Sequence, residues 1–236
     1  MDSKSSVEQI RARFDADVDR FSDLAAGQLT AMDSALCLDL IAQGAAAVTP
    51  GATTLLDVGC GAGNWTLRLL EVLPKLDVTL MDLSQPMLDR AIARVTAAGA
   101  TSITIQQCDV RGCRFEPGSF DLIVAGSVLH HLREEDEWRA VFKNFHRWLR
   151  PGGSVWVYDL VTHEHPVVEQ RMAERYATYL KTLGGEELAR KVFDYVAEED
   201  SPRPVTWQLE RMREAGFATV DILHKTATFA AYTAVR

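Results

Sequence analysis

The sequence predicts a doubly wound α/β fold, in which helices cover both faces of a mostly parallel sheet. Between residues 53 and 161, short runs of β-branched and leucine residues alternate with segments of helical periodicity. A glycine-rich turn follows the first of these runs directly. The 236 residues are 47% hydrophobic and 25% charged, which is enough apolar material for one domain with a sizeable core.

A helical N-terminal cap is predicted over residues 1–50. Apolar side chains recur there at steps of three and four residues, the spacing of one helix face. These side chains are Ile10, Phe14, Val18, Phe21 and Leu24. We interpret Phe14 and Phe21 as packing residues rather than as substrate contacts. A second cap helix, rich in alanine and leucine, is predicted over 31–47, and Pro50 ends it.

The predicted core occupies residues 51–161 and contains five strands and three helices. The strands are predicted over 53–58, 78–81, 103–107, 120–125 and 154–161, and the helices over 65–73, 84–95 and 132–149. Ser84 is placed to cap the second of these helices, and Pro86 lies in its first turn. Because strands alternate with helices, we expect these five strands to be parallel.

The alternation breaks after residue 161. Two helices rich in glutamate, arginine and tyrosine are predicted over 163–184 and 186–199. We interpret the segment 162–204 as a helical lid insertion into the domain.

The chain is predicted to finish, over 205–236, with one helix and a pair of strands. The helix covers 205–215, and the strands cover 218–223 and 227–235. The connection between these strands is so short that they must pair antiparallel. The whole chain is thus predicted to be one domain with a seven-stranded sheet and an antiparallel last strand.

Charge and composition disfavour several classes of protein. The 33 acidic and 25 basic residues give a net charge of −8, which disfavours binding to nucleic-acid phosphates. The apolar runs are far shorter than the roughly 20 residues of a membrane span, and no signal peptide is visible. Cys37, Cys60, Cys108 and Cys113 form no Cys-x-x-Cys pair, so we expect no zinc site. These features favour a cytoplasmic protein.

The stretch from Asp57 to Gly63 is the most informative for chemistry. It places an acidic residue before a Gly-x-Gly-x-Gly sequence, between a predicted strand and a predicted helix. Glycines let such a loop turn tightly and let a ligand approach the backbone. Asp82 ends the second predicted strand about 20 residues further on, where a carboxylate can accept both hydroxyls of a ribose. Asp57 would repel a pyrophosphate and favour a cation or an ammonium group.

Several separate blocks resemble the class I S-adenosylmethionine-dependent methyltransferases, which have a Rossmann-like fold. The blocks are Asp57–Gly63, Asp82, Cys108–Val110, Phe120–Val124 and Leu149–Gly153. The resemblance covers roughly residues 53–160, and the predicted last pair of strands agrees with it.

The resemblance implies S-adenosylmethionine as the cofactor. Asp57 and the glycine loop would hold its methionine part, Asp82 its ribose and Asp109 its adenine amino group. Two apolar side chains would flank the adenine, and 126–127 would line the face of methyl transfer. The contacts implied in this way are Asp57, Gly59, Cys60, Gly61, Gly63, Asp82, Leu83, Met87, Asp109, Val110, Gly126 and Ser127.

The residues after the fourth predicted strand lack the sequence marks of three classes of methyltransferase. Ala125–Val128 contains neither the Asn/Asp-Pro-Pro-aromatic stretch of enzymes that methylate nucleic-acid amino groups nor the Pro-Cys of cytosine-C5 enzymes. It also lacks the carboxylate that metal-dependent catechol-type enzymes carry there. We therefore expect a small-molecule acceptor whose specificity comes from the cap and the insertion. In its layout the chain is loosely similar to the carboxy-S-adenosylmethionine synthase group.

Two pairs of residues are candidates for catalysis. His130 and His131 are interpreted either as a general base that takes a proton from the acceptor, or as one packing and one helix-capping residue. Metal ligation with the acidic residues 134–136 is less favoured, and no metal is predicted. Arg175 and Tyr176 belong to a predicted helix face, set by three- and four-residue spacing, that would place a cation and tyrosine hydroxyls near the ligand. The residues of this face are Arg171, Arg175, Tyr176 and Tyr179. The alternative is an ordinary amphipathic helix with tyrosine packed and arginine solvated.

Three functions stay open at this point. The first is methyl transfer to a small-molecule acceptor by in-line SN2 displacement. The second is intramolecular cyclisation of S-adenosylmethionine to azetidine-2-carboxylate with release of methylthioadenosine. The third is a non-catalytic protein that binds S-adenosylmethionine. We expect a small-molecule partner, no nucleic acid and no membrane, and we allow for a homodimer.

Overall fold

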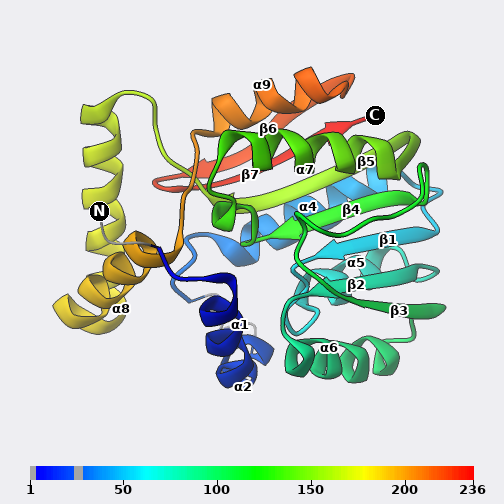
Figure 1. Cartoon of the computed structure of the whole chain (residues 1–236), viewed down its shortest axis with the longest axis horizontal. Coiled ribbons are helices and arrows are strands. Elements are labelled where there is room, and N and C mark those ends of the chain that lie inside the picture. Colours follow the sequence, from blue (N-terminus) through cyan, green and yellow to red (C-terminus); the bar gives the residue numbers. More distant parts are fainter. Residues whose placement is uncertain (1–3, 24–28) are drawn as a thin grey trace.

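A seven-stranded sheet in the order β3-β2-β1-β4-β5-β7-β6 lies at the centre of the structure (Figure 1). The computed structural model describes residues 4–23 and 29–236. The strands are β1 (Thr54–Val58), β2 (Asp77–Asp82), β3 (Ser102–Gln107), β4 (Phe120–Gly126), β5 (Leu149–Leu160), β6 (Thr219–Thr226) and β7 (Phe229–Val235). β7 pairs antiparallel with both of its neighbours, and the other adjacent pairs are parallel. The doubly wound fold with an antiparallel last strand is therefore confirmed.

Helices cover both faces of this sheet. Side chains of consecutive strand residues point to opposite faces, so Leu55 lies in one hydrophobic core and Leu56 in the other. The first core packs under α4 (Ser34–Val48), α5 (Asn64–Val72) and α6 (Gln85–Ala97). The second core packs under α7 (Glu135–Trp148) and α9 (Val205–Ala215). No helix among the described residues combines the length and apolarity needed to span a membrane.

Several predicted boundaries differ from the observed ones, and two of the differences have a clear local cause. The helix expected from residue 132 begins at Glu135, because Leu129–His131 form a short 3-10 turn and Glu134 caps the helix. The strand expected from residue 154 begins at Leu149 and pairs there with Phe120 of β4. The proline and glycines after Leu149 suggested a loop, but their backbone continues the sheet.

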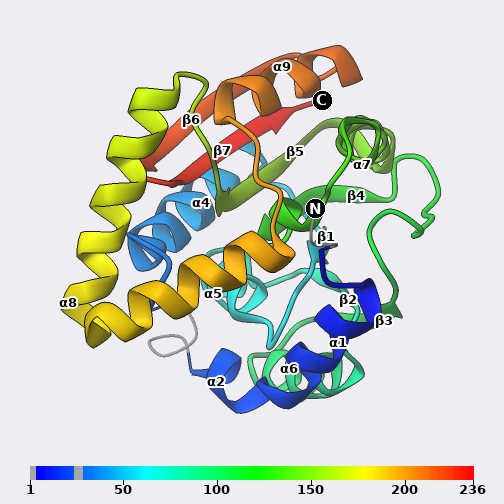
Figure 2. The same cartoon turned by 60° about the vertical axis from the view of Figure 1, so that its left-hand side comes forward.

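The N-terminal segment forms α1 (Val7–Ala16) and α2 (Val18–Ser22), separated at Asp17. Ser6 caps α1 in a reciprocal capping box with Gln9. Leu24, the last residue of the predicted apolar stripe, lies outside the described residues. The lid insertion forms α8 (Pro166–Glu199), which non-helical backbone at residues 184–185 divides into two arms (Figure 2). The two predicted lid helices are thus confirmed.

The arrangement of strands fixes where a ligand can bind. β2 and β4 lie on either side of β1, so the chain leaves the sheet in opposite directions from β1 and from β4. In doubly wound sheets the crevice outside the carboxyl ends of the strands at this switch point is the usual binding site. α1 and the second arm of α8 lie beside this end of the sheet (Figure 2).

Arg13 of α1 joins the cap to the lid. Its guanidinium donates to both carboxylate oxygens of Glu199 and to the hydroxyl of Tyr195, at 2.8–3.2 Å. The Glu199 side chain is only 8% exposed, so removal of Arg13 would leave a buried carboxylate without its ion-pair partner. The same guanidinium lies over the rings of Phe14 and Tyr195. These contacts hold α1 against the end of α8.

We therefore expect Arg13→Ala to loosen α1 without unfolding the sheet. Charge-assisted hydrogen bonds of this kind contribute roughly 1.5–3 kcal/mol, so hydrogen exchange in residues 7–16 should become at least about tenfold faster. Exchange in β4 should stay the same. Arg20→Ala, which removes an exposed pair with Asp17, is the matched control and should change little. Equal acceleration in both variants would contradict the role given to Arg13.

Candidate functional site

A cavity of about 730 Å³ lies at the carboxyl ends of β1 and β4. Most of the residues predicted to form the site line it. They are Gly59, Cys60, Gly61, Asp82, Leu83, Met87, Asp109, Val110, Gly126, Ser127, His130 and Tyr176. Three predicted site residues, Asp57, Gly63 and Arg175, are not among the lining residues.

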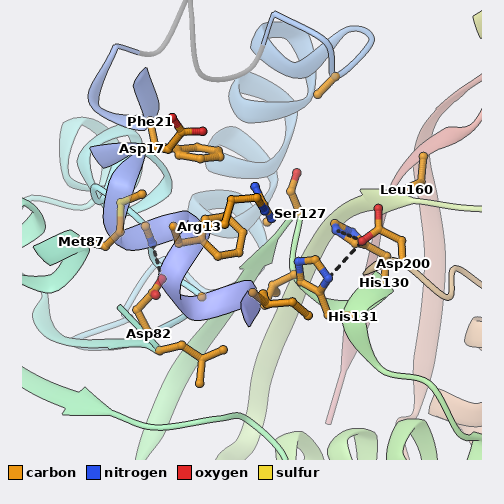
Figure 3. A pocket seen from close by; sticks show the side chains of 18 of the residues that line it. Arg13, Asp17, Phe21, Asp82, Met87, Ser127, His130, His131, Leu160 and Asp200 are labelled. Carbon is orange, nitrogen blue, oxygen red and sulfur yellow. Dashed lines mark hydrogen bonds and ion pairs between the residues drawn. The ribbon is translucent and has the colours of Figure 1, made fainter. Parts of the chain in front are cut away.

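Asp82 is fixed at the cavity wall by backbone N–H groups. Gly61 N donates to its Oδ2 at 2.8 Å and Ser84 N donates to its Oδ1 at 2.9 Å (Figure 3). Gly61 has a φ of +49°, and a Cβ added there would meet nothing within 4 Å, so this part of the loop faces open space. Each carboxylate oxygen keeps a further lone pair. The side chain is therefore oriented in advance to accept two hydroxyl groups from a ligand.

Asp57 lies beneath the glycine loop rather than in the cavity. It is fully buried and accepts a hydrogen bond from Thr66 Oγ1 at 2.6 Å. Its Oδ1 has no hydrogen-bond partner among the described residues. Burial raises the pKa of Asp57 to about 7, against a small lowering by Thr66. Asp57 does not line the cavity, and its predicted part in holding the methionine end of the cofactor stays a prediction.

Gly126 lets the indole of Trp65 lie against the end of β4. A Cβ at position 126 would lie 1.9 Å from Trp65 Nε1, so no larger residue fits without moving the indole. Trp65 is 4% exposed, and its ring centroid lies 5.8 Å from that of Tyr158 on β5. Trp65 therefore packs against the sheet and also lines the cavity.

Asp109 is already engaged by a neighbouring side chain. Arg111 Nε donates to its Oδ1 at 2.8 Å, and the other arm of Arg111 reaches Glu137 at 3.1 Å. Burial raises the pKa of Asp109, but Arg111 outweighs this and holds it below its usual range. Cys108 and Cys113 form a disulfide that closes this turn. No pattern in the sequence predicted this disulfide. The cytoplasmic location stays a prediction.

His130 and His131 lie beside two buried carboxylates. The Nδ1 of His130 contacts Asp159, which also accepts the backbone N–H of Leu129 at 2.7 Å. Asp200 Oδ1 lies 3.7 Å from His130 Nε2 and 3.1 Å from His131 Nδ1. Burial lowers the pKa of His130, but Asp159 and Asp200 outweigh it and raise the pKa to about 9. Burial and the neighbouring His130 lower the pKa of His131.

The tyrosines of the lid attach it to the cap. Tyr176 OH donates to the backbone oxygen of Thr30 at 2.9 Å, and Tyr179 OH donates to that of Leu29 at 2.8 Å. Tyr176 is buried, whereas Arg175 is exposed on α8. The structure thus does not bring Arg175 and Tyr176 to the ligand together. A catalytic role for Tyr176 stays a prediction, and its observed contacts are those of a packing residue.

Some residues of the site were missed by sequence reasoning. Phe14 and Phe21, interpreted as packing residues, line the cavity, because α1 and α2 lie over its mouth. Asp200 is about seventy positions from the histidines, and only the fold brings them together. Asp159 did carry a signal, since it follows the run of large apolar and aromatic residues 155–158 in β5 and a buried carboxylate needs partners.

Comparison with known proteins identifies relatives of this chain. Residues 55–153 match the family described as a methyltransferase domain. Demethylmenaquinone methyltransferase of Lactococcus lactis subsp. lactis is 31% identical over 173 residues, which cover 71% of this chain and 67% of that protein. The enzyme of the same name from Staphylococcus aureus strain JH9 is 29% identical over 183 residues, which cover 76% of this chain and 73% of that one.

Solved structures show the same fold. An O-methyltransferase family protein from Burkholderia thailandensis matches 95% of this chain with a TM-score of 0.68 and 19% identity. Human N-acetylserotonin methyltransferase, solved in complex with S-adenosylmethionine, matches 99% of it with a TM-score of 0.64 and 16% identity. This chain spans 62% and 63% of the length of those two chains.

The buried charge of Asp57 yields a prediction about stability. The unfolded carboxyl ionises near pH 3.8, while in the folded protein its pKa is raised to about 7. Between these values the folded state holds the extra proton, so this group makes the protein less stable as pH rises, until the loss is complete near pH 7. We expect Asp57→Asn to raise the unfolding free energy of the ligand-free protein at pH 8 by on the order of 2–4 kcal/mol, and to change it little at pH 4.

Thermal unfolding at several pH values checks this expectation. Asp89→Asn, an exchange on the outer side of α6, is the control and should show no such pH-dependent gain. A stability difference for Asp57→Asn that does not grow between pH 4 and pH 7 would contradict the raised pKa.

Proposed function

Since the chain belongs to the class I S-adenosylmethionine-dependent methyltransferases, we propose that it methylates a small acceptor with a largely apolar body. The observation that carries the proposal is the continuity of the cavity. One part is bounded by the glycine loop and Asp82, and the other part lies under α1, α2 and α8.

The residues of the first part fit the cofactor. Asp82 is held ready to accept the two ribose hydroxyls, Gly61 presents backbone to open space, and Leu83 and Met87 provide apolar surface near Asp82. Asp57 adds negative charge beneath the loop when it is ionised, which favours a cationic ligand. S-adenosylmethionine supplies a methyl group on a positively charged sulfur.

The second part of the cavity indicates the chemistry of the acceptor. Its walls from the cap and the lid are mostly aliphatic and aromatic. They include Val7, Ile10, Phe14, Phe21, Leu29, Leu188, Val192 and Val196. Such walls favour an apolar molecule and exclude water from the reacting atoms. The curated relatives are named for methylating demethylmenaquinone, which supports an acceptor of this general kind.

The chain's own contribution to methyl transfer is to hold two ligands in line and to keep water away. Positioning of this kind removes much of the barrier of a bimolecular displacement. The environment of His130 does not favour the predicted base role, because a pKa of about 9 leaves its imidazole protonated at neutral pH. The base role accordingly stays a prediction.

No observation favours the cyclisation of S-adenosylmethionine. The relatives are named for methyl transfer, and a second, apolar chamber has no purpose in a reaction with one substrate. A non-catalytic role is likewise not supported by the comparisons. A homodimer stays a prediction.

Incubation with S-adenosylmethionine followed by mass spectrometry tests the proposed function. We expect S-adenosylhomocysteine to form only when an acceptor is added, with hydroquinones and phenols carrying apolar substituents as first candidates. Methylthioadenosine formed from the cofactor alone would instead show cyclisation. Asp82→Asn should weaken S-adenosylmethionine binding at least about tenfold in calorimetry, because one lost carboxylate hydrogen bond is worth roughly 1.5–3 kcal/mol.

Asp221→Asn on the outer strand β6 is the matched control for that variant, because its side chain is exposed. It should bind the cofactor as the unchanged protein does. Equal affinity of Asp82→Asn and the unchanged protein would contradict the assignment of Asp82 to the ribose.

The apolar chamber yields a separate prediction about the acceptor. Phe14→Ala removes a half-buried ring, equivalent to roughly 1 kcal/mol of apolar burial, so KM for the acceptor should rise about fivefold. The Kd of S-adenosylmethionine should stay within about twofold. Val168→Ala, an exposed position on α8 outside the cavity, should change neither. A rise in the cofactor Kd as large as that in the acceptor KM would contradict this division of the cavity.

A further inference from the structure

We propose that His130, His131 and Asp200 form a binding site for one divalent transition-metal ion, and that this ion holds an oxygen atom of the acceptor. The second half of the proposal rests on the proposed methyl transfer, whereas the first half stands on geometry alone. The three side chains lie together at the cavity wall (Figure 3).

The separations of the three side chains fit a common ligand. One ligand atom from each, an imidazole nitrogen or a carboxylate oxygen, can be chosen so that all lie within 4.8 Å of one another. Asp200 Oδ1 lies 3.1 Å from His131 Nδ1 and 3.7 Å from His130 Nε2. Two atoms bound about 2.0–2.2 Å from one ion are themselves roughly 3–3.5 Å apart. Asp200 is therefore already about as far from each histidine nitrogen as two ligands of one ion are from each other.

His131 and Asp200 contact each other as an ion pair, but the geometry of this contact does not make a hydrogen bond. Both ring nitrogens of His131 and the Oδ1 of Asp200 have no hydrogen-bond partner among the described residues. The Asp200 side chain is 2% exposed and that of His131 is 16% exposed. Buried polar atoms without partners are costly, so a ligand at this point would satisfy them.

Asp159 orients the imidazole of His130. It contacts Nδ1 of His130, which leaves Nε2 directed toward Asp200. Asp159 is itself held by the backbone N–H groups of Leu129 and His130, at 2.7 and 3.2 Å. Metal-binding histidines usually donate a hydrogen bond from their second ring N–H to a carboxylate or carbonyl in this way.

The backbone holds the two halves of the cluster in register. His130 and His131 lie in the 3-10 turn after β4, and Asp200 follows the end of α8. Ser201 N donates to His130 O at 2.7 Å, which fixes the end of the lid to the turn. The cluster is therefore assembled by the fold before any ligand arrives.

The balance of charge also favours a cation. Asp159 and Asp200 are both buried, and neutral imidazoles would leave two negative charges between them. Arg13, whose charge acts on both His130 and Asp200, is already hydrogen-bonded to Glu199. A divalent ion bound between the two buried carboxylates would offset both charges.

The donor set selects the kind of metal and leaves room for the acceptor. Two imidazoles and one carboxylate suit zinc, cobalt, iron or manganese better than calcium or magnesium, which prefer oxygen ligands. Three protein ligands leave coordination positions open. His131 lies edge-on to Phe14, with ring centroids 6.0 Å apart, so the open side adjoins the apolar chamber. An acceptor with a hydroxyl or enol oxygen on an apolar body would satisfy both parts.

Titration with Co²⁺ after dialysis against a chelator tests the site without any methyl transfer. We expect one ion per chain. Its visible d–d absorption bands should have the positions typical of cobalt with nitrogen and oxygen ligands. Zn²⁺ should displace the cobalt and raise the melting temperature. Absence of the bands at a cobalt concentration tenfold above that of the protein would overturn the proposal.

Variants locate the bound ion. Asp200→Asn and His131→Gln preserve size and should each weaken Co²⁺ binding at least about a hundredfold, while Asp159→Asn should weaken it roughly 10–100-fold through His130. Circular dichroism confirms that each variant is folded. His224→Ala is the control, because His224 also contacts a carboxylate, Asp33, but lies outside the cluster. Equal loss in this control, or none in the first two variants, would overturn the assignment.

Methyl-transfer assays of these variants separate the proposed metal site from the proposed function. Methyl transfer that continues in a variant unable to bind Co²⁺, with unchanged acceptor KM, would disprove the role of the ion while leaving the methyltransferase function intact. If the protein binds cobalt as described but transfers no methyl group, the proposed function is disproved and the metal site is kept.

Discussion

The carboxylate of Asp82 is the constraint on which the site depends. It stands at the end of β2 and is bound by the backbone of the glycine loop at Gly61 and by the start of α6 at Ser84. One side chain thus joins a strand, a loop and a helix, and it fixes the loop that follows β1. Because these groups are already satisfied before a ligand binds, little conformational entropy remains to be lost when the ligand arrives.

Around this fixed centre the structure places parts that are less firmly attached. α1 contacts the lid through Arg13 and Glu199, and the lid contacts the cap through Tyr176 and the backbone of Thr30. The first hydrophobic core extends into the lid through Tyr176, Leu180 and Ala189, whereas α1 contributes to neither core and meets the lid through the polar contacts of Arg13. We therefore expect local opening of α1 to cost less than unfolding of the sheet.

Sequence reasoning succeeded where the signal was local. The Gly-x-Gly-x-Gly loop, Asp82 at the end of its strand, and the glycines that divide the lid were all readable from periodicity and turn residues. It failed where distant segments meet. The carboxylate of Asp200 joins the histidines only because the lid returns to the turn after β4, and Phe14 reaches the cavity only because the cap lies over it. The ion pair of Asp109 with Arg111 was also missed, although the two residues are neighbours in the chain.

A crystal structure of the protein with S-adenosylhomocysteine and one divalent metal present tests the central claim most directly. The account predicts that the ribose hydroxyls lie within hydrogen-bond distance of the Asp82 carboxylate and that the thioether sulfur faces the chamber beneath α1. A nucleoside bound elsewhere, or one whose ribose makes no contact with Asp82, would contradict it.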